Sequence, residues 1–145
     1  MKSVREILMK KGKTTWSVTP ETTVYDALQL MAEKEIGAVL VLKNGNVEGI
    51  MSERDYARKV ILQGKSSKDT LVKEIMSSKV LYVNTSLSTE ECMALMINKR
   101  VRHLPVFEGG QLAGIISIGD VVKAVIDEKE FVIDLLVHYI TGTPI

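Results

Sequence analysis

The 145-residue sequence is poor in several features that mark particular classes of protein. Its one cysteine, Cys92, excludes a scaffold held together by disulfides. Basic and acidic residues nearly cancel, 19 against 18, so the basic excess of a general nucleic-acid binder is missing. No apolar run approaches the roughly 20 residues that cross a membrane, and the N-terminus lacks the apolar core of a secretory signal. We therefore expect a protein of the reducing cytoplasm, with neither DNA nor a membrane as its partner.

Groups that carry common catalytic chemistry are also scarce. One cysteine and two distant histidines offer no set of metal ligands. No nucleophile stands in a recognisable pair with a base, and no Walker-type phosphate loop is present. We therefore expect no enzyme activity, no catalytic cofactor and no metal. Cys92 falls on the apolar side of a predicted helix, which favours a place in the core over a role as nucleophile.

The sequence does have the composition of an ordinary globular protein, and it contains an internal repeat. Apolar residues make up 46% and charged residues 26%, enough to build a core and too apolar for disorder. When the chain is shifted by 65 positions, residues 18–60 align with 83–125 without a gap, and 11 of the 43 pairs are identical. A shorter match aligns Val4–Ile7 with Val72–Ile75. We predict one repeat over 4–64, a second over 70–127, and a C-terminal helix and tail over 128–145.

Each repeat shows the same order of patterns. A short amphipathic helix and a short strand come first, then a longer helix that begins after a capping residue, Thr23 or Ser88. Two strands joined by a tight turn follow, at Asn44-Gly45 and at Gly109-Gly110. A second helix closes each repeat. This β-α-β-β-α unit predicts a mixed α/β fold, with two small sheets packed face to face about a pseudo-twofold axis and helices outside.

A pattern of glycine, serine and aspartate closes the last strand of both repeats. It reads Gly49-x-x-Ser52-x-x-Asp55 in the first and Gly114-x-x-Ser117-x-x-Asp120 in the second. One interpretation is structural, with serine capping the helix and aspartate completing a capping box. The other is functional, because a helix N-terminus attracts anions and a carboxylate can hold both hydroxyls of a ribose. The two interpretations are compatible.

The duplicated unit, the paired motifs and the Arg-His-Leu-Pro-Val segment at 102–106 resemble a tandem pair of cystathionine β-synthase (CBS) domains, a Bateman module. The resemblance covers about residues 4–128. It implies a regulatory module that binds AMP, ADP, ATP, S-adenosylmethionine or NAD(H). By the same resemblance, Asp55 and Asp120 hold ribose hydroxyls, and the neighbouring cap residues contact ribose or phosphate. The implied nucleotide-binding set is Trp16, Ser17, Gly37, Ala38, Val39, Ser52, Arg54, Asp55, Tyr82, Arg102, His103, Leu104, Pro105, Ser117, Gly119 and Asp120.

The two repeats depart from each other at this set. The first has Gly37 and Ala38 where the second has Arg102 and His103, and Leu40 where the second has Pro105. Arg54 supplies a charge where the second repeat has Gly119. We therefore expect unequal affinities. If His103 contacts phosphate, affinity should fall as pH rises past about 6.5, where an unperturbed imidazole loses its charge.

The leading functional hypothesis is a non-catalytic sensor of adenine nucleotides that signals to an unknown protein in trans. The alternative is a structural homodimerisation module without a specific ligand. A tail rich in apolar residues, which includes Phe131, Leu135 and Tyr139, predicts a further helix that ends near Gly142. Because the first repeat has no counterpart to it, this helix must cover either its own chain or a second subunit. We expect a homodimer.

Overall fold

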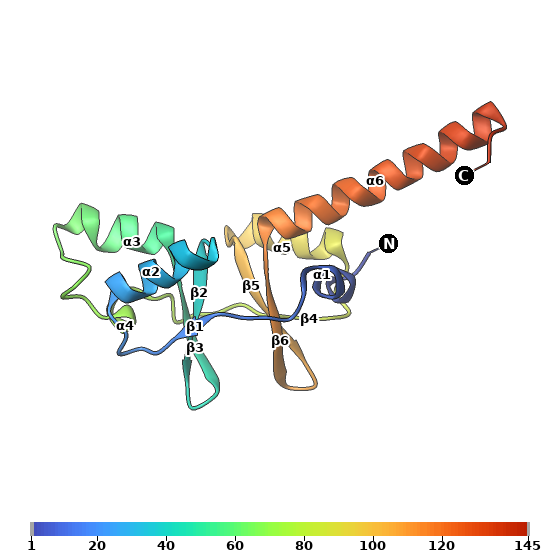
Figure 1. Cartoon of the computed structure of the whole chain (residues 1–145). Helices are drawn as coiled ribbons and strands as arrows, with labels where there is room; N and C mark the ends of the chain where they lie inside the picture. The colour runs from blue at the N-terminus through green and yellow to red at the C-terminus, as the bar shows by residue number, and fades with distance from the viewer. Residues whose placement is uncertain (1, 145) are drawn as a thin grey trace. The chain divides into compact units, whose positions relative to one another are not determined.

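The structure is a computed structural model that describes residues 2–144. These residues form two compact units, each with its own hydrophobic core (Figure 1). One unit is Thr15–Leu81, and the other joins the chain up to Thr14 to the chain from Tyr82 onward.

The unit Thr15–Leu81 has a three-stranded sheet in the order β1-β2-β3, in which β1 is parallel and β3 antiparallel to β2. Its elements are β1 (Ser17–Val18), α2 (Val24–Lys34), β2 (Ala38–Lys43), β3 (Asn46–Ser52), α3 (Glu53–Lys59), the 3-10 helix η1 (Ile61–Gln63) and α4 (Val72–Ile75).

The other unit repeats this topology in the order β4-β5-β6. Its elements are α1 (Val4–Lys11), β4 (Val83–Asn84), α5 (Thr89–Lys99), β5 (His103–Glu108), β6 (Gln111–Ser117) and α6 (Ile118–Thr141). The predicted duplication and mixed α/β class are therefore confirmed.

Local signals in the sequence set the boundaries of these elements. The hydroxyl of Thr23 accepts a hydrogen bond from the amide of Asp26, and Ser88 forms a capping box with Glu91, as predicted. The turns between paired strands place Gly45 and Gly110 at φ values of 78°, a conformation that costs glycine little. Both hairpins carry an irregularity at the same place, after Val41 and after Val106 in β2 and β5.

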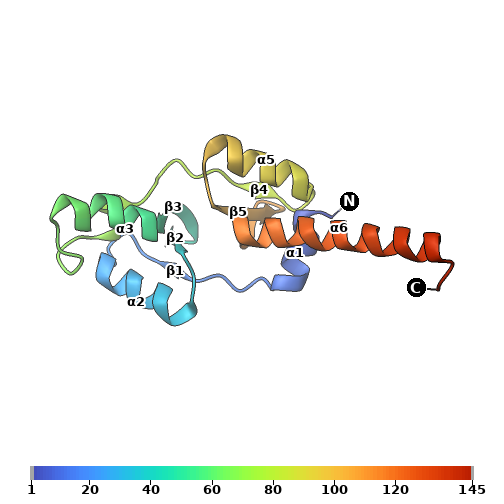
Figure 2. The ribbon, with the colours of Figure 1, turned by 90° about the horizontal axis from the view of Figure 1, so that it is seen from above.

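The short helices α1 and α4 lie with the elements of the other sequence repeat. Helix α1 buries Val4, Ile7 and Leu8 in the core that contains β4, β5 and β6, and Figure 2 shows it beside the first turns of α6. Helix α4 buries Val72 and Ile75 in the core of the unit Thr15–Leu81. Each compact unit therefore combines one helix from one repeat with the remaining elements of the other.

The same backbone hydrogen bonds hold both exchanged helices. The amide of Val4 donates to the carbonyl of Leu87 at 2.8 Å, and that of Val72 donates to Thr22 at 2.8 Å. These two pairs occupy corresponding places in the repeats. Helix α4 belongs to the unit Thr15–Leu81 and α1 belongs to the other unit. The chain therefore passes from one unit to the other twice, once before Thr15 and once after Leu81.

The motif glycines let these helices approach the sheets. A Cβ atom at Gly49 would lie 2.8 Å from both the Ser77 carbonyl oxygen and the Met76 sulfur, next to α4. A Cβ atom at Gly114 would lie 2.7 Å from a terminal methyl of Leu8 in α1. The glycine in each Gly-x-x-Ser-x-x-Asp pattern is therefore explained by packing.

Helix α6 differs from the prediction of a separate C-terminal helix. It runs without a break for 24 residues and ends at Gly142, which takes a left-handed conformation. Residues 128–130 contain no proline or glycine to interrupt it, so the second-repeat helix and the tail helix are one. In residues 2–144 neither α6 nor any other helix has the length and apolarity needed to cross a membrane.

Cys92 lies in the core, as predicted. Its side chain is fully buried, and burial raises the pKa of its thiol to about 11. The thiolate form is therefore scarce at neutral pH, which argues against a reactive cysteine.

Candidate functional site

The two serine–aspartate motifs lie where a strand turns into a helix, at the junctions β3–α3 and β6–α6. Ser52 and Ser117 are the N-caps, and each accepts a hydrogen bond at 3.1 Å from the amide of its aspartate, Asp55 or Asp120. Each aspartate in turn accepts from the amide of its serine, which completes a capping box. The structural interpretation is confirmed, and capping does not by itself exclude a ligand.

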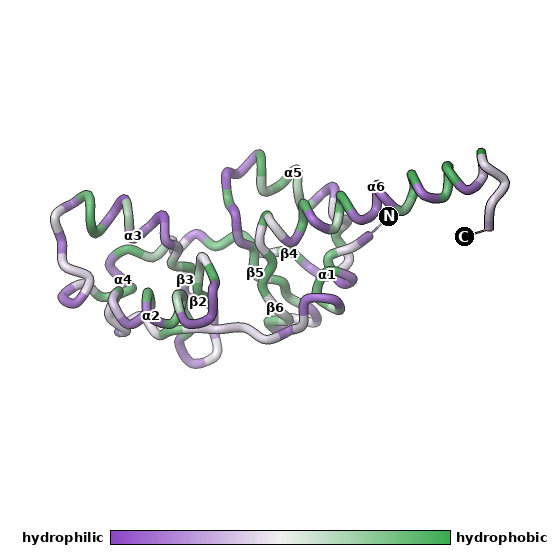
Figure 3. Tube along the Cα trace, turned by 45° about the horizontal axis from the view of Figure 1, so that its top comes forward, coloured by the Kyte–Doolittle hydropathy of each residue, from purple (hydrophilic) through white to green (hydrophobic). Residues whose placement is uncertain are grey.

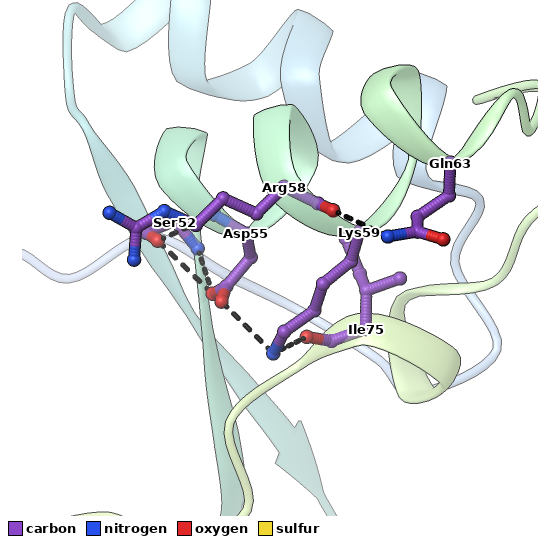
Figure 4. Close-up of polar contacts among 6 residues, drawn as sticks. All are labelled: Ser52, Asp55, Arg58, Lys59, Gln63 and Ile75. Atoms are coloured by element: carbon purple, nitrogen blue, oxygen red, sulfur yellow. Dashed lines mark hydrogen bonds and ion pairs between the residues drawn. The ribbon is translucent and has the colours of Figure 1, made fainter.

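In the unit Thr15–Leu81, both carboxylate oxygens of Asp55 have partners (Figure 4). Oδ2 accepts from the amide and hydroxyl of Ser52 at 2.9 and 3.1 Å. Oδ1 forms an ion pair at 3.2 Å with Lys59, one helical turn further along α3. Lys59 also donates to the carbonyl of Ile75 at 2.8 Å, at the end of α4. A ribose hydroxyl at Asp55 must therefore compete with an intramolecular cation.

In the other unit, the partners of Asp120 gather on one oxygen. Oδ2 accepts from the amide of Ser117 at 2.8 Å and from Lys11 of α1 at 2.7 Å. Lys11 also donates to the carbonyl of Ile115 at 2.9 Å. Within residues 2–144, none of the hydrogen bonds of this carboxylate uses Oδ1. The side chain of Asp120 is also more exposed than that of Asp55, 27% against 15%.

The surroundings of Asp120 keep it charged. Burial alone would raise its pKa, but the hydrogen bonds from Lys11 and Ser117 and the positive charge of Lys11 outweigh burial and lower the pKa. An ionised carboxylate accepts stronger hydrogen bonds than a neutral one. Asp120 is thus an ionised acceptor whose partners gather on Oδ2.

A cavity of about 490 Å³ opens beside this carboxylate, between α1 and the first turns of α6. Its volume lies in the range typical of sites for small molecules. Seven of its nine lining residues are charged: four are lysines (Lys2, Lys10, Lys11, Lys123) and three are acidic (Glu6, Asp120, Asp127). Two of the lysines are paired, Lys10 with Asp127 at 3.3 Å and Lys11 with Asp120. No ion pair in the described part of the chain involves the other two.

The residues that the resemblance implied fall into two separate sets, one in each unit. The unit Thr15–Leu81 contains Trp16, Ser17, Gly37, Ala38, Val39, Ser52, Arg54 and Asp55. The other unit contains Tyr82, Arg102, His103, Leu104, Pro105, Ser117, Gly119 and Asp120. Strand pairing brings Ala38 opposite Ser52 and His103 opposite Ser117, so these two members lie beside their serine–aspartate motifs. Of the sixteen predicted residues, only Asp120 lines the cavity between α1 and α6.

Some members of these sets face the core. Val39 and Leu104 are fully buried in it, so only their backbone is open to a ligand, the kind of contact that the resemblance implies. Other members remain accessible: the Trp16 ring is 39% exposed beneath the ammonium of Lys34, and Tyr82 is 65% exposed and stacks on Phe107. Whether any of these residues contacts a ligand stays a prediction.

Two lysines were not among the predicted site residues. Lys59 was interpreted as part of a solvated helix face, and although exposed, it also neutralises Asp55. Lys11 lies 109 residues before Asp120, and only the exchange of α1 brings the two together. The pairing at offset 68 between Val4–Ile7 and Val72–Ile75 was the one signal in the sequence for these helices.

His103 differs from a free imidazole. Burial, the nearby charge of Lys11 and that of Arg102 all lower its pKa, and these effects outweigh Asp120, which raises it. At neutral pH His103 is therefore an uncharged side chain. Its loss of charge therefore occurs below pH 6.5, the value for an unperturbed imidazole, and its contact with phosphate stays a prediction.

This shift predicts how stability depends on pH. The unfolded chain binds a proton at His103 more readily than the folded chain does, so the free energy of unfolding falls as pH drops below about 6.5. We expect His103→Gln, which cannot titrate, to lose less stability between pH 7 and pH 5 than the unmodified protein. Urea unfolding at several pH values measures this. Parallel pH profiles for the two proteins would contradict the prediction.

Comparisons with known proteins agree with this architecture. The CBS domain family model matches residues 4–61 and 72–127. The CBS domain-containing protein CBSX3, mitochondrial, of Arabidopsis thaliana is 39% identical, over 97% of this chain and 72% of that protein. The structure of a putative signal-transduction protein with CBS domains from Burkholderia ambifaria is 57% identical, with a TM-score of 0.84, and the match covers 86% of this chain and 94% of that one.

A more distant neighbour shares the fold alone. The CBS domain pair of MJ0100 was solved in complex with 5′-methylthioadenosine and S-adenosylmethionine; it is 18% identical, with a TM-score of 0.77, over 88% of this chain and 98% of that one. The two family-model matches cover most of the present chain and coincide with its duplicated sequence. This chain therefore belongs to the CBS domain family and carries two CBS domains in tandem.

Proposed function

We propose that the protein is a non-catalytic regulatory module that binds an adenine nucleotide, with Asp120 as its primary ribose-binding residue. The observation that carries this proposal is the ionised carboxylate of Asp120, which lines a 490 Å³ cavity and whose hydrogen bonds within residues 2–144 are all made by Oδ2. A vicinal diol suits a charged acceptor of this kind. The MJ0100 pair supports the proposal to the extent that the same fold accommodates adenosine compounds.

The charges of the cavity favour one class among the candidate ligands. Lys2 and Lys123 add positive charge beside the Asp120–Lys11 pair. A phosphate group placed there would gain charge-assisted hydrogen bonds, whereas the sulfonium of S-adenosylmethionine would meet charge of its own sign. We therefore expect AMP, ADP, ATP or NAD(H) to bind more tightly than S-adenosylmethionine or adenosine.

We propose that occupancy of the site is passed to a separate protein. A ligand changes the balance between two conformations of such a module only if it binds one of them more tightly than the other. The proposal includes a homodimer and a cytoplasmic setting. The alternative, a dimerisation module without a specific ligand, is favoured by the exposed apolar end of α6.

Isothermal titration calorimetry on the full chain tests the proposal with AMP, ADP, ATP, NAD, S-adenosylmethionine and adenosine. We expect the phosphorylated nucleotides to bind, and Lys2→Met with Lys123→Met to weaken ATP binding several-fold while leaving adenosine unchanged. Lys129→Met with Lys13→Met is the matched control, since it removes two lysines that do not line the cavity. If no adenine compound binds at millimolar concentration, the nucleotide proposal fails and the dimerisation alternative takes its place.

A further inference from the structure

The chain that follows α3 forms an exposed turn at one end of the unit Thr15–Leu81, as Figure 1 shows. It contains η1 and closes at Gly64, which takes a left-handed conformation with φ at 69°. The amides of Gln63 and Lys65 both donate to the carbonyl of Val60, at 3.2 and 2.9 Å. These hydrogen bonds give the turn a fixed shape, so the side chains on it form a defined surface.

Two adjacent aliphatic side chains lie exposed at this turn. Ile61 is 55% exposed and Leu62 is 77% exposed, whereas Val60, just before them, is fully buried in the core. Figure 3 shows hydrophobic residues at the end of α3 and hydrophilic residues in the loop beyond. Exposed aliphatic side chains are common singly, but turns are normally built from polar residues and glycine. Ile61 and Leu62 therefore make an apolar tip on the surface.

Basic side chains flank this apolar tip on both sides in the sequence. Residues 58–68, here called the basic turn, contain Arg58, Lys59, Lys65 and Lys68 and no acidic residue. All four basic residues are exposed. In the part of the chain that the structure describes, only Lys59 among them forms an ion pair with a carboxylate. Because the whole chain has a net charge of only +1, the basic turn is a local concentration of positive charge.

The second repeat lacks this combination. Its corresponding segment, residues 123–133, lies inside the unbroken helix α6. It contains two lysines and three acidic residues, and Asp127 stands where the first repeat has Leu62. The duplicated fold therefore forms without a basic turn, and the stability of the fold does not account for one.

We propose that the basic turn is a docking surface for an anionic lipid bilayer. Cationic side chains meet the negative potential of the headgroups, and exposed aliphatic side chains enter the boundary between headgroups and acyl chains. The expectation that a membrane is no partner was based on the lack of a spanning segment, and contact with the surface of a bilayer needs none. The proposal does not depend on nucleotide binding.

The apolar tip favours a bilayer over other anionic partners. A nucleic acid would meet the basic side chains with its phosphates but offers no apolar layer to Ile61 and Leu62. A peptide helix with an apolar face binds where a groove receives its side chains. Leu62, at 77% exposure, protrudes from the turn and suits a soft surface that it can enter.

Sedimentation of the full-length protein with vesicles tests the role of charge. We expect it to sediment with vesicles of phosphatidylcholine mixed with phosphatidylserine at low salt, and to be released as salt screens the headgroups. The double variant Arg58→Gln with Lys65→Gln should lower the partition coefficient roughly 25-fold, at about 5-fold for each positive charge near the surface. Lys123→Gln with Lys129→Gln is the matched control, because it removes two exposed lysines from the corresponding segment of the second repeat and should change little.

A single substitution tests the role of the apolar tip. Leu62→Ser should lower the partition coefficient several-fold, whereas Met9→Ser, which removes a side chain that is 74% exposed in α1, should leave it unchanged. Far-UV circular dichroism checks that each variant is folded. The proposal is overturned if the two lysine-and-arginine variants lose binding equally, or if Leu62→Ser binds like the unmodified protein. It is also overturned if the unmodified protein stays in the supernatant with phosphatidylserine vesicles at low salt, whether or not it then binds single-stranded RNA or an acidic peptide.

Discussion

Gly49→Ala should destabilise the unit Thr15–Leu81 by roughly 2–4 kcal/mol, as expected for overpacking combined with a disturbed backbone hydrogen bond. The added Cβ would lie 2.8 Å from the carbonyl oxygen of Ser77. That oxygen accepts from the amide of Ile50 at 3.1 Å, and the amide of Ser77 donates back at 2.9 Å. The clash therefore cannot be relieved by a side-chain rotation, because it involves backbone that is paired in both directions.

Gly114→Ala is the matched control, at the corresponding position of β6. Its new Cβ would meet the end of the Leu8 side chain at 2.7 Å, with the next atom at 3.5 Å. A leucine can turn to another rotamer, so we expect a smaller loss, about 1 kcal/mol. The comparison isolates the rigidity of the neighbour, since the substitution and the place in the sheet are the same.

Urea unfolding with two probes measures both effects. Trp16 is the only tryptophan and lies in the unit Thr15–Leu81, so its fluorescence follows that unit, while circular dichroism follows the whole chain. In Gly49→Ala the midpoint reported by Trp16 should fall markedly, whereas in Gly114→Ala the loss, read from circular dichroism because Gly114 lies in the other unit, should be smaller. An equal or larger loss in Gly114→Ala would mean that contact with paired backbone does not decide the cost.

These glycines show which parts of the fold the sequence could predict. The motif, its repetition and the capping roles of Ser52 and Ser117 depend on residues close together in the chain, and local patterns predicted them. The close approach of α4 to Gly49 and of α1 to Gly114 depends on which unit each short helix joins. Periodicity within eight residues or fewer says that a helix is amphipathic, but it does not say which core receives the apolar face.

The site shows the same division. Asp55 and Asp120 were given the same ribose-binding role because the motif is the same in both repeats, and unequal affinities were expected only from other residues, Arg102 and His103 among them. The two carboxylates differ in their ion pairs. Lys59 lies four residues after Asp55 on the same helix, whereas Lys11 contacts Asp120 only because the fold brings α1 beside α6. The length of α6 was missed for another reason. Two adjacent helical patterns were treated as separate although no breaking residue lies between them.

The contrast between the two aspartates predicts that Asp120→Asn abolishes most nucleotide binding while Asp55→Asn does not. Replacing a charged acceptor by a neutral one should weaken the contact with a ribose diol by about 1.5–3 kcal/mol, or roughly 10- to 100-fold in affinity. Asparagine retains an oxygen that can accept from the serine amide, so the cap at Ser117 or Ser52 is largely preserved. Calorimetry with the tightest ligand of the panel gives both affinities.

Lys59→Met should then reveal the weaker site. It removes the cation from Oδ1 of Asp55 and leaves the hydrogen bonds of Ser52 to Oδ2 in place. With that oxygen released, we expect a second binding event, seen as a stoichiometry that rises toward two per chain at the same ligand concentration. The double variant Lys59→Met with Asp55→Asn should return to one, since the gain depends on the released carboxylate. Unchanged stoichiometry in Lys59→Met would show that the ion pair does not limit the first repeat, and equal losses in Asp120→Asn and Asp55→Asn would show that the free oxygen of Asp120 gives it no advantage.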